Sequence, residues 1–196
     1  QTFLWVVLPY VVTVAFAVGM FWRYRYDQFG WTTRSSQMYE SRLLRIGSPL
    51  FHVGILFALA GHILGLVIPQ GWTEAVGVSE HVYHVAAVAS GVLAAVMVVT
   101  GLAILVYRRR TVGRVFTVTT RMDKLMYVML GAVVVAGVYN TVAINLLNVT
   151  GQYPGGYNYR ESVAVWFRSL FVFSPDAAGM IEAPPSFQIH AVLAML

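Results

Sequence analysis

Cysteine is absent from this 196-residue sequence. Its absence excludes disulfide bonds, cysteine-held iron–sulfur clusters and thiolate chemistry from the chain. Any iron bound here is therefore held by histidine, methionine, tyrosine or carboxylate side chains. Charge is scarce as well: charged residues make up 11% of the sequence and hydrophobic residues 58%, whereas a soluble domain carries about 25% charged residues. The composition predicts an integral membrane protein.

Targeting and repeat signals are also lacking. No basic residue precedes the first apolar stretch and no small-residue cleavage site follows it, so no cleavable signal peptide is predicted. The chain starts with Gln1 and stops inside an apolar run, which leads us to expect a trimmed copy of a longer protein. The net charge of +5 does not indicate nucleic-acid binding, because the basic residues cluster beside apolar runs, as membrane topology requires.

Five apolar segments define the expected fold, since crossing the hydrocarbon of a bilayer takes about 20 residues in a helix. They cover residues 3–22, 49–68, 82–107, 125–147 and 186–196. We expect an all-α, single-domain membrane bundle over residues 1–196, with the fifth helix cut off at its C-terminal end. Between the fourth and fifth segments, Val163, Trp166, Phe167, Leu170 and Phe171 recur at helical spacing. That spacing predicts a short amphipathic helix on the outer membrane surface, or a lid packed over the end of the bundle.

Lysine and arginine alternate between the connecting loops. The four loops, at 23–48, 69–80, 108–124 and 148–185, carry five, zero, six and two of them. Basic residues accumulate in cytoplasmic loops. We therefore expect a multi-pass protein of the bacterial cytoplasmic membrane, with loops one and three in the cytoplasm and the N-terminus outside.

Two histidines, His52 and His62, lie inside the second apolar segment. Ten residues of helix place them about 15 Å apart along the axis, one in each half of the bilayer. Gly54, Ala58 and Gly61 beside them leave room for a neighbouring helix or a flat porphyrin. A further histidine, His190, lies near the start of the fifth segment, which places it at about the same depth in the membrane as His62.

These histidines have two readings. A histidine in a membrane helix either packs with its ring hydrogen-bonded to a backbone carbonyl, or it binds a ligand. His62 and His190 at matching depth satisfy the requirement of a bis-histidine haem b, which transfers electrons. His52 then needs a partner deeper in the membrane, which we expect beyond Leu196. His81 and His84, three residues apart at the start of the third segment, fit a metal site, a proton acceptor or ordinary surface histidines.

Four arginines at helix ends are candidate partners of haem propionates, because these carboxylates favour cations near the membrane face. They are Arg23, Arg25, Arg108 and Arg109. Topology determinants and headgroup anchors have the same placement.

Three stretches carry a resemblance to a known family. They are RYRYDQFGWTTRSSQM at 23–38, the FHVGIL and GHILG segments that hold His52 and His62, and FQIHAVLAM around His190. Over nearly its whole length the chain resembles the gamma subunit of respiratory nitrate reductase, a di-haem cytochrome b membrane anchor. The resemblance implies that His62 and His190 ligate the distal haem, and that His52 is one ligand of the proximal haem.

The resemblance also implies an activity and partners. Menaquinol or ubiquinol is oxidised near the distal haem, and protons leave to the outside. Electrons cross to a cytoplasmic iron–sulfur beta subunit and then to a molybdenum alpha subunit that reduces nitrate. The family uses a basic residue early in the third span, where this chain has His81 and His84 instead of lysine. These two residues and Gly65 are the candidates for the quinol site.

Two alternatives remain open at the level of the sequence. One is a related haem b anchor of another cytoplasmic reductase, of heterodisulfide or sulfite type. The other is a haem-free channel or transporter whose histidines line a pore, although transporters usually show repeats and broken helices.

Overall fold

The computed structural model describes residues 2–28 and 36–196, and the regular elements in this part of the chain are all helices, with no β-strand. Part of the stretch at 23–38 that carries the resemblance, including Arg34, lies outside the described residues. Four helices are long and apolar enough to cross a membrane: Phe3–Tyr26, Arg42–Val67, Glu80–Thr111 and Arg121–Leu146. They correspond to the first four expected spans, which are confirmed as membrane-spanning candidates.

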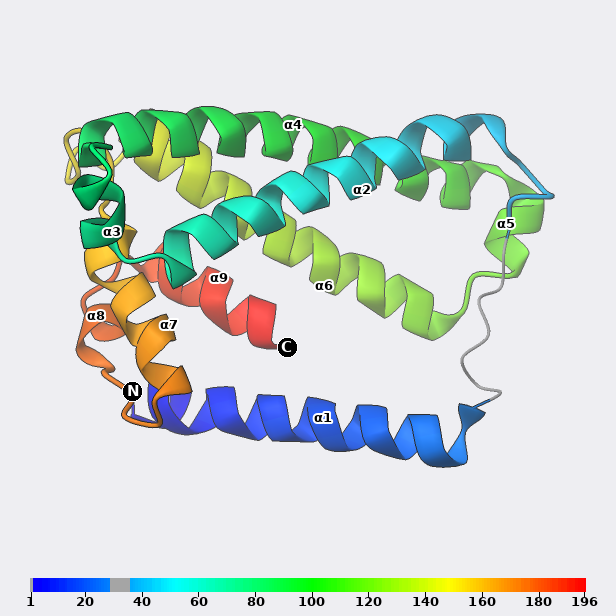
Figure 1. The fold of residues 1–196 in the computed structure, drawn as a ribbon. Helices are drawn as coiled ribbons and strands as arrows, with labels where there is room; N and C mark the ends of the chain where they lie inside the picture. The colour runs from blue at the N-terminus through cyan, green and yellow to red at the C-terminus, as the bar shows by residue number, and fades with distance from the viewer. Residues whose placement is uncertain (1, 29–35) are drawn as a thin grey trace.

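Three of the long helices combine an α-helix labelled in Figure 1 with a π-helical segment, and the remaining one is α-helical along its whole length. The first is η1 (Phe3–Val7) and α1 (Leu8–Tyr26), the second α2 (Arg42–His62) and η3 (Ile63–Val67), the third α4 (Glu80–Thr111), and the fourth α6 (Arg121–Val138) and η4 (Tyr139–Leu146). The fifth expected span is the shorter helix α9 (Pro185–Met195). It is not among the four candidates, so a count of five spans is not confirmed.

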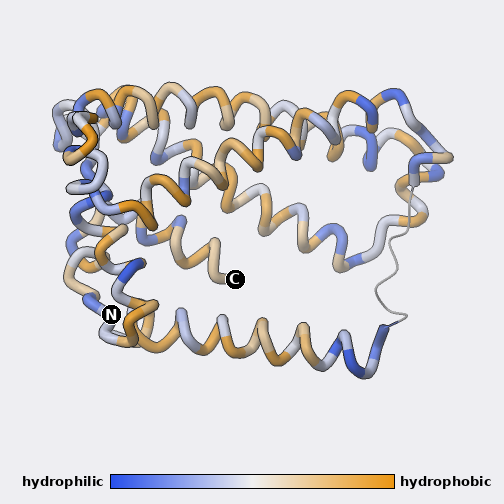
Figure 2. The backbone as a smooth tube through the Cα atoms, viewed as in Figure 1, coloured by the Kyte–Doolittle hydropathy of each residue, from blue (hydrophilic) through white to orange (hydrophobic). Residues whose placement is uncertain are grey.

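Short helices occupy the two ends of the bundle. At the end that holds the N-terminus lie α3 (Gln70–Ala75), η5 (Tyr159–Glu161), α7 (Val163–Phe171) and α8 (Ala178–Ile181). The opposite end holds α5 (Gly113–Thr117). Loops one and three therefore lie together at one end, and loops two and four lie with the N-terminus at the other (Figure 1). Hydrophilic residues gather at these two ends (Figure 2), as the charge alternation predicts, and the side of the membrane that each end faces stays a prediction.

The second helix begins earlier than the sequence suggested. We expected it to start at Pro49, but α2 runs from Arg42 and contains Pro49. Apolarity marks only the part of a helix inside the bilayer, and here the helix continues into the basic loop. The Glu40 carboxylate accepts a hydrogen bond of 2.7 Å from the Leu43 N–H and satisfies one of the free donors of the first turn. Proline removes one backbone bond from the interior, and the helix continues through it.

Glycines bring α2 and α4 into direct backbone contact, and this pair forms the most extensive helix packing of the bundle. A Cβ atom added to Gly101 would lie 2.5 Å from the Phe51 nitrogen, and one added to Gly54 would lie 2.9 Å from the Val98 nitrogen. Both contacts are between backbones, so neither position has room for a side chain. The α2–α4 pair is therefore a rigid frame that carries His52 and His62.

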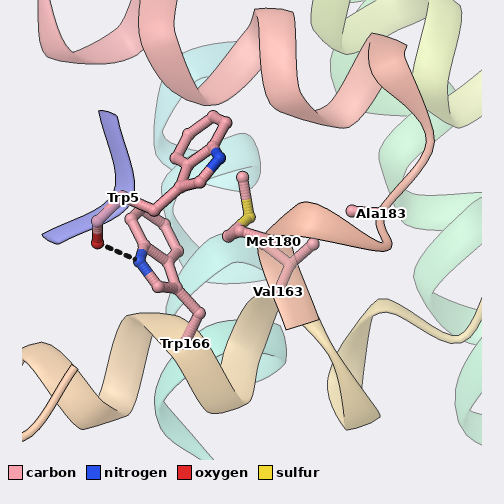
Figure 3. Close-up of a cluster of buried hydrophobic side chains, with 5 residues drawn as sticks. All are labelled: Trp5, Val163, Trp166, Met180 and Ala183. Carbon is pink, nitrogen blue, oxygen red and sulfur yellow. Dashed lines mark hydrogen bonds between the residues drawn. The ribbon is translucent and has the colours of Figure 1, made fainter. Parts of the chain in front are cut away.

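A cluster of buried apolar side chains closes the N-terminal end of the bundle (Figure 3). Its members are Trp5, Val163, Trp166, Met180 and Ala183. The Trp166 indole N–H donates a 2.7 Å hydrogen bond to the Trp5 carbonyl oxygen, and the two rings meet edge to face at 5.8 Å. The helix predicted from the apolar spacing is thus α7, and its packing matches a lid over the bundle end. Its position on the outer membrane surface stays a prediction.

Candidate functional site

His62 and His190 lie next to each other although 128 positions separate them in the sequence. The centres of their rings are 6.2 Å apart and the ring planes are inclined by 33°. His62 ends α2, whereas His190 lies in the middle of α9. The predicted match in depth between the second and fifth segments therefore brings two imidazoles from different helices together.

Backbone bonds orient the rings of α2. The Nδ1–H of His62 donates to the Ala58 carbonyl oxygen at 2.7 Å, and the Nδ1–H of His52 donates to the Ser48 carbonyl oxygen at the same distance. A carbonyl only accepts, so Nδ1 carries the proton in both neutral rings and Nε2 carries the free lone pair. Both histidines are exposed to the space around the helix. Each thus presents the nitrogen that a metal ion requires.

His190 is seated on a glycine of α6. A Cβ atom added to Gly137 would lie 3.0 Å from the His190 Cε1 atom. The buried Nδ1 atom of His190 makes no well-formed hydrogen bond within the described part of the chain. One turn beyond Gly137, Asn140 is also buried, and its side-chain nitrogen donates to the Ser186 carbonyl oxygen at 3.4 Å. This amide therefore links η4 to α9.

The separation of the two histidine rings is compatible with one metal ion between them. Metal–nitrogen bonds of about 2.0 Å to each ring require ring centres roughly 6 Å apart, and the observed separation is 6.2 Å. Among residues 2–28 and 36–196, no group of three or more His, Cys, Asp or Glu side chains is arranged to hold a bare metal ion. A porphyrin supplies four of the six ligands of iron itself, so two imidazoles from the protein are sufficient.

Three of the long helices contain a π-helical segment. The segment η1 begins the first long helix, whereas η3 and η4 end the second and the fourth. All three are therefore at the end of the bundle that holds the N-terminus. π-Helical turns are rare and occur frequently at functional sites. These segments were not predicted from the sequence, because no local residue pattern distinguishes π-helical turns from ordinary helix.

The quinol-site candidates occupy the bundle end beyond the histidine pair. His81 is exposed on the first turn of α4. His84 is half-buried, and its ring packs against Gly156 in loop four. Gly65 is buried in η3, and the ring of Tyr159 fills the space that its missing side chain leaves. The structure therefore separates His81 from His84 by environment and covers Gly65 with an aromatic residue.

Arg160, which the sequence analysis did not single out, is the buried centre of this end. Its side chain is 1% exposed and pairs with Glu80 at 2.9 Å. The guanidinium lies 3.8 Å from the centre of the Tyr83 ring and donates to the Thr73 hydroxyl at 3.1 Å. Burial, followed by the neighbouring Tyr83, raises the pKa of Tyr159 well above its usual value. Partners 80 and 87 positions away leave no local signal in the sequence.

The four candidate propionate partners have different surroundings. Arg23 and Arg25 are exposed at the end of α1. Arg109 donates to the Tyr127 hydroxyl at 3.0 Å. Arg108 is buried, pairs with Glu40 at 2.7 Å and also donates to the side chain and carbonyl of Ser36. All three nitrogens of the Arg108 guanidinium are thus engaged in fastening loop one to α4, and contact of any of these arginines with a propionate stays a prediction.

Comparison with known proteins gives one consistent result. The family model described as "Nitrate reductase gamma subunit" matches residues 1–196. The nitrate reductase gamma chain of Bacillus subtilis is 39% identical over 190 residues, which cover 97% of this chain and 82% of that protein. The respiratory nitrate reductase 2 gamma chain of Escherichia coli is 30% identical over 196 residues, which cover all of this chain and 83% of that protein.

A second kind of relative is much longer. The nitrate reductase-like protein NarX of Mycobacterium tuberculosis is 54% identical over 191 residues, which cover 97% of this chain. The aligned region is 28% of the length of that protein.

Proposed function

Because the chain belongs to the nitrate reductase gamma subunit family, we propose that it is the membrane haem b subunit of a respiratory nitrate reductase and oxidises quinol near the outer membrane face. The proposed partners are a cytoplasmic iron–sulfur beta subunit and, through it, a molybdenum alpha subunit. The observation that carries the proposal is the pair of imidazoles from α2 and α9, with ring centres 6.2 Å apart.

His62 and His190 are the proposed axial ligands near the outer face, and His52 is proposed as one ligand of a second haem deeper in the membrane. Their role is to supply Nε2 lone pairs in a fixed orientation, which the bonds to Ala58 and Ser48 provide for the two histidines of α2. Haem b held there supplies reversible one-electron transfer, which suits the passage of electrons from quinol toward the cytoplasmic subunits.

We assign proton release to the end of the bundle at which α4 begins. Oxidation of a quinol liberates two protons, and an imidazole with an ordinary pKa near 6.5 is a suitable acceptor. His84 is half-buried beside loop four, while His81 is exposed on the same helix. We assign the acceptor role to His84 and transfer toward water to His81. Release outside while electrons move inward does work against the membrane potential, worth about 2.3 kcal/mol per charge per 100 mV.

An optical difference spectrum of the full complex, reduced minus oxidised, tests the proposal. We expect two b-type signals in the wild type, and loss of one of them in His62→Ala and in His190→Ala. His81→Ala removes a histidine of the same chain outside the proposed ligand set, so it should keep both signals. A wild-type complex without b-type signals would contradict the proposal and favour a haem-free channel or transporter. A complex that keeps both signals after either ligand substitution would refute the ligand assignment.

A further inference from the structure

Tyr159 lies between the two helices that carry the histidine pair. A Cβ atom added to Gly65 would lie 2.6 Å from the Tyr159 hydroxyl oxygen and 2.8 Å from its Cε2 atom. On its other side Tyr159 stacks on Phe187, with ring centres 6.4 Å apart and planes inclined by 24°. Gly65 follows His62 by three positions, and Phe187 precedes His190 by three. One aromatic ring thus touches both helices about one turn from each histidine.

The two histidine helices have their main packing partners elsewhere. The most extensive contacts of α2 are with α4, whereas α9 packs mainly on α6 and η4. Their mutual spacing at this end therefore depends on the packing of α4 against α6 and η4 and on the residues that lie between the two histidine helices. Tyr157 reinforces the contact, because its ring is 5.0 Å from Phe187 and its backbone N–H donates to the Asn145 side-chain oxygen at 2.9 Å.

Arg160 fixes the position of Tyr159 from the next residue along the chain. Its guanidinium is 1% exposed and is held by Glu80 at 2.9 Å, by Thr73 at 3.1 Å and by the ring of Tyr83. A buried guanidinium that is paired and hydrogen-bonded resists displacement, because loss of the Glu80 carboxylate would leave its charge uncompensated. The backbone at 159–160 is therefore anchored to α3 and α4, outside the two helices that Tyr159 separates.

We propose that Tyr159 is a positioning residue whose ring sets the separation of His62 and His190 from the outer side. This inference rests on the proposed function, because it gives the spacing a purpose. The ring fills the gap between Gly65 and Phe187, and the hydroxyl is not required for that. Phenylalanine should therefore replace tyrosine, and alanine should not.

The first test is a pair of substitutions in the full complex, Tyr159→Ala and Tyr159→Phe, followed by optical and electron paramagnetic resonance spectra. In Tyr159→Ala we expect loss of at least half of the low-spin signal assigned to His62 and His190, with the signal of the His52 site retained. Tyr159→Phe should keep both signals. The inference is overturned if Tyr159→Ala leaves the outer signal unchanged, or if it removes both signals equally, since that would indicate a general loss of folding.

The second test approaches the same contact from Gly65. Gly65→Ala places a methyl group where the Tyr159 ring now lies, so it should weaken the outer signal to a similar extent. The double variant Gly65→Ala/Tyr159→Ala should lose no more signal than Tyr159→Ala alone, because the clash requires the ring. Gly71→Ala is the matched control, since a Cβ there meets nothing within 4 Å, and it should match the wild type. Losses that multiply in the double variant would overturn the inference.

The two tests distinguish a failure of the positioning role of Tyr159 from a failure of the proposed function. If the wild-type complex lacks a b-type signal that depends on His62 and His190, the proposed function and the positioning role of Tyr159 are both refuted. If the signal is present but insensitive to Tyr159→Ala, the haem site stands and only the positioning role is refuted.

Discussion

At the scale of single residues, the bundle holds its few charges by pairing them across long sequence distances. Arg108 meets Glu40 at one end and Arg160 meets Glu80 at the other. Both arginines are almost completely buried, at a cost that the paired carboxylates offset, although the Nε atom of Arg160 has no hydrogen-bond partner within the described part of the chain. Each pair joins a loop to α4, so loops one and four are both attached to this helix.

The pairing of Glu40 with Arg108 predicts a dependence of stability on pH. Partial burial acts to raise the pKa of Glu40, but the hydrogen bonds from Leu43 and Arg108, with the charge of Arg108, outweigh it and leave the pKa below its usual value of 4.5. The folded state therefore favours the ionised carboxylate. Its contribution to stability is present above about pH 4.5 and is lost as the pH falls through the lower folded value.

Thermal unfolding of wild type and Glu40→Gln between pH 7 and pH 3.5 checks this expectation. The wild type should have the higher melting temperature at pH 7, and the difference should shrink as the pH falls below about 4.5. Glu161→Gln, which removes an exposed carboxylate in η5, should show no comparable difference. A gap that persists unchanged to pH 3.5 would contradict a charge-based role for Glu40.

At the scale of elements, the sequence located the helices well and their ends poorly. Hydropathy placed all four candidate spans, because a bilayer core demands continuous apolar sequence, and the helical spacing of apolar residues placed the short helix α7. It placed the start of α2 at Pro49 instead of Arg42, because helices extend past the hydrocarbon wherever polar residues still favour them. Figure 2 shows these polar ends beyond the apolar middle of the bundle.

The residues of the candidate site also form two groups, those predicted from the sequence and those that were not. The depth argument predicted that His62 and His190 would approach each other, because helical rise converts sequence position into height. Gly137, Tyr159 and Arg160 were not found, because their roles depend on contacts between elements far apart in sequence. Height along a helix can be calculated from a sequence, whereas lateral packing between helices can not.

Glycine at the α2–α4 crossing gives a prediction at this scale. A methyl group at Gly101 would lie 2.5 Å from the Phe51 nitrogen and 2.7 Å from its Cα atom, so the two helices must separate to admit it. We expect Gly101→Ala to destabilise the protein by about 1–3 kcal/mol, the usual cost of overpacking. Because α2 carries His52 and His62, both proposed haem signals should weaken as well.

The matched control is Gly131→Ala in α6, where an added Cβ meets nothing within 4 Å. That substitution should be neutral or stabilise the helix by up to about 1 kcal/mol, since alanine favours helix more than glycine does. Thermal unfolding of both variants in detergent measures the difference. Equal effects at the two positions would contradict the close crossing.

At the scale of the whole molecule, the two ends of the bundle differ in charge and in architecture. The end with loops one and three carries five and six basic residues, whereas loops two and four carry zero and two. The histidine pair, the π-helical segments and the lid helix α7 all belong to the end with the N-terminus. If the basic end faces the cytoplasm, the proposed quinol chemistry lies on the outer side, where its protons are released.

The orientation of the bundle can be measured by site-specific labelling, because the sequence contains no cysteine. Trp72 in α3 and Met122 at the start of α6 lie at opposite ends, and both are well exposed, at 70% and 71%. In intact cells, Trp72→Cys should react with a membrane-impermeant maleimide, while Met122→Cys should react only after permeabilisation. The expected orientation rests on the excess of basic residues in loops one and three. The reverse pattern would put the histidine pair on the cytoplasmic side, where the protons of quinol would be released inside and the reaction would no longer work against the membrane potential.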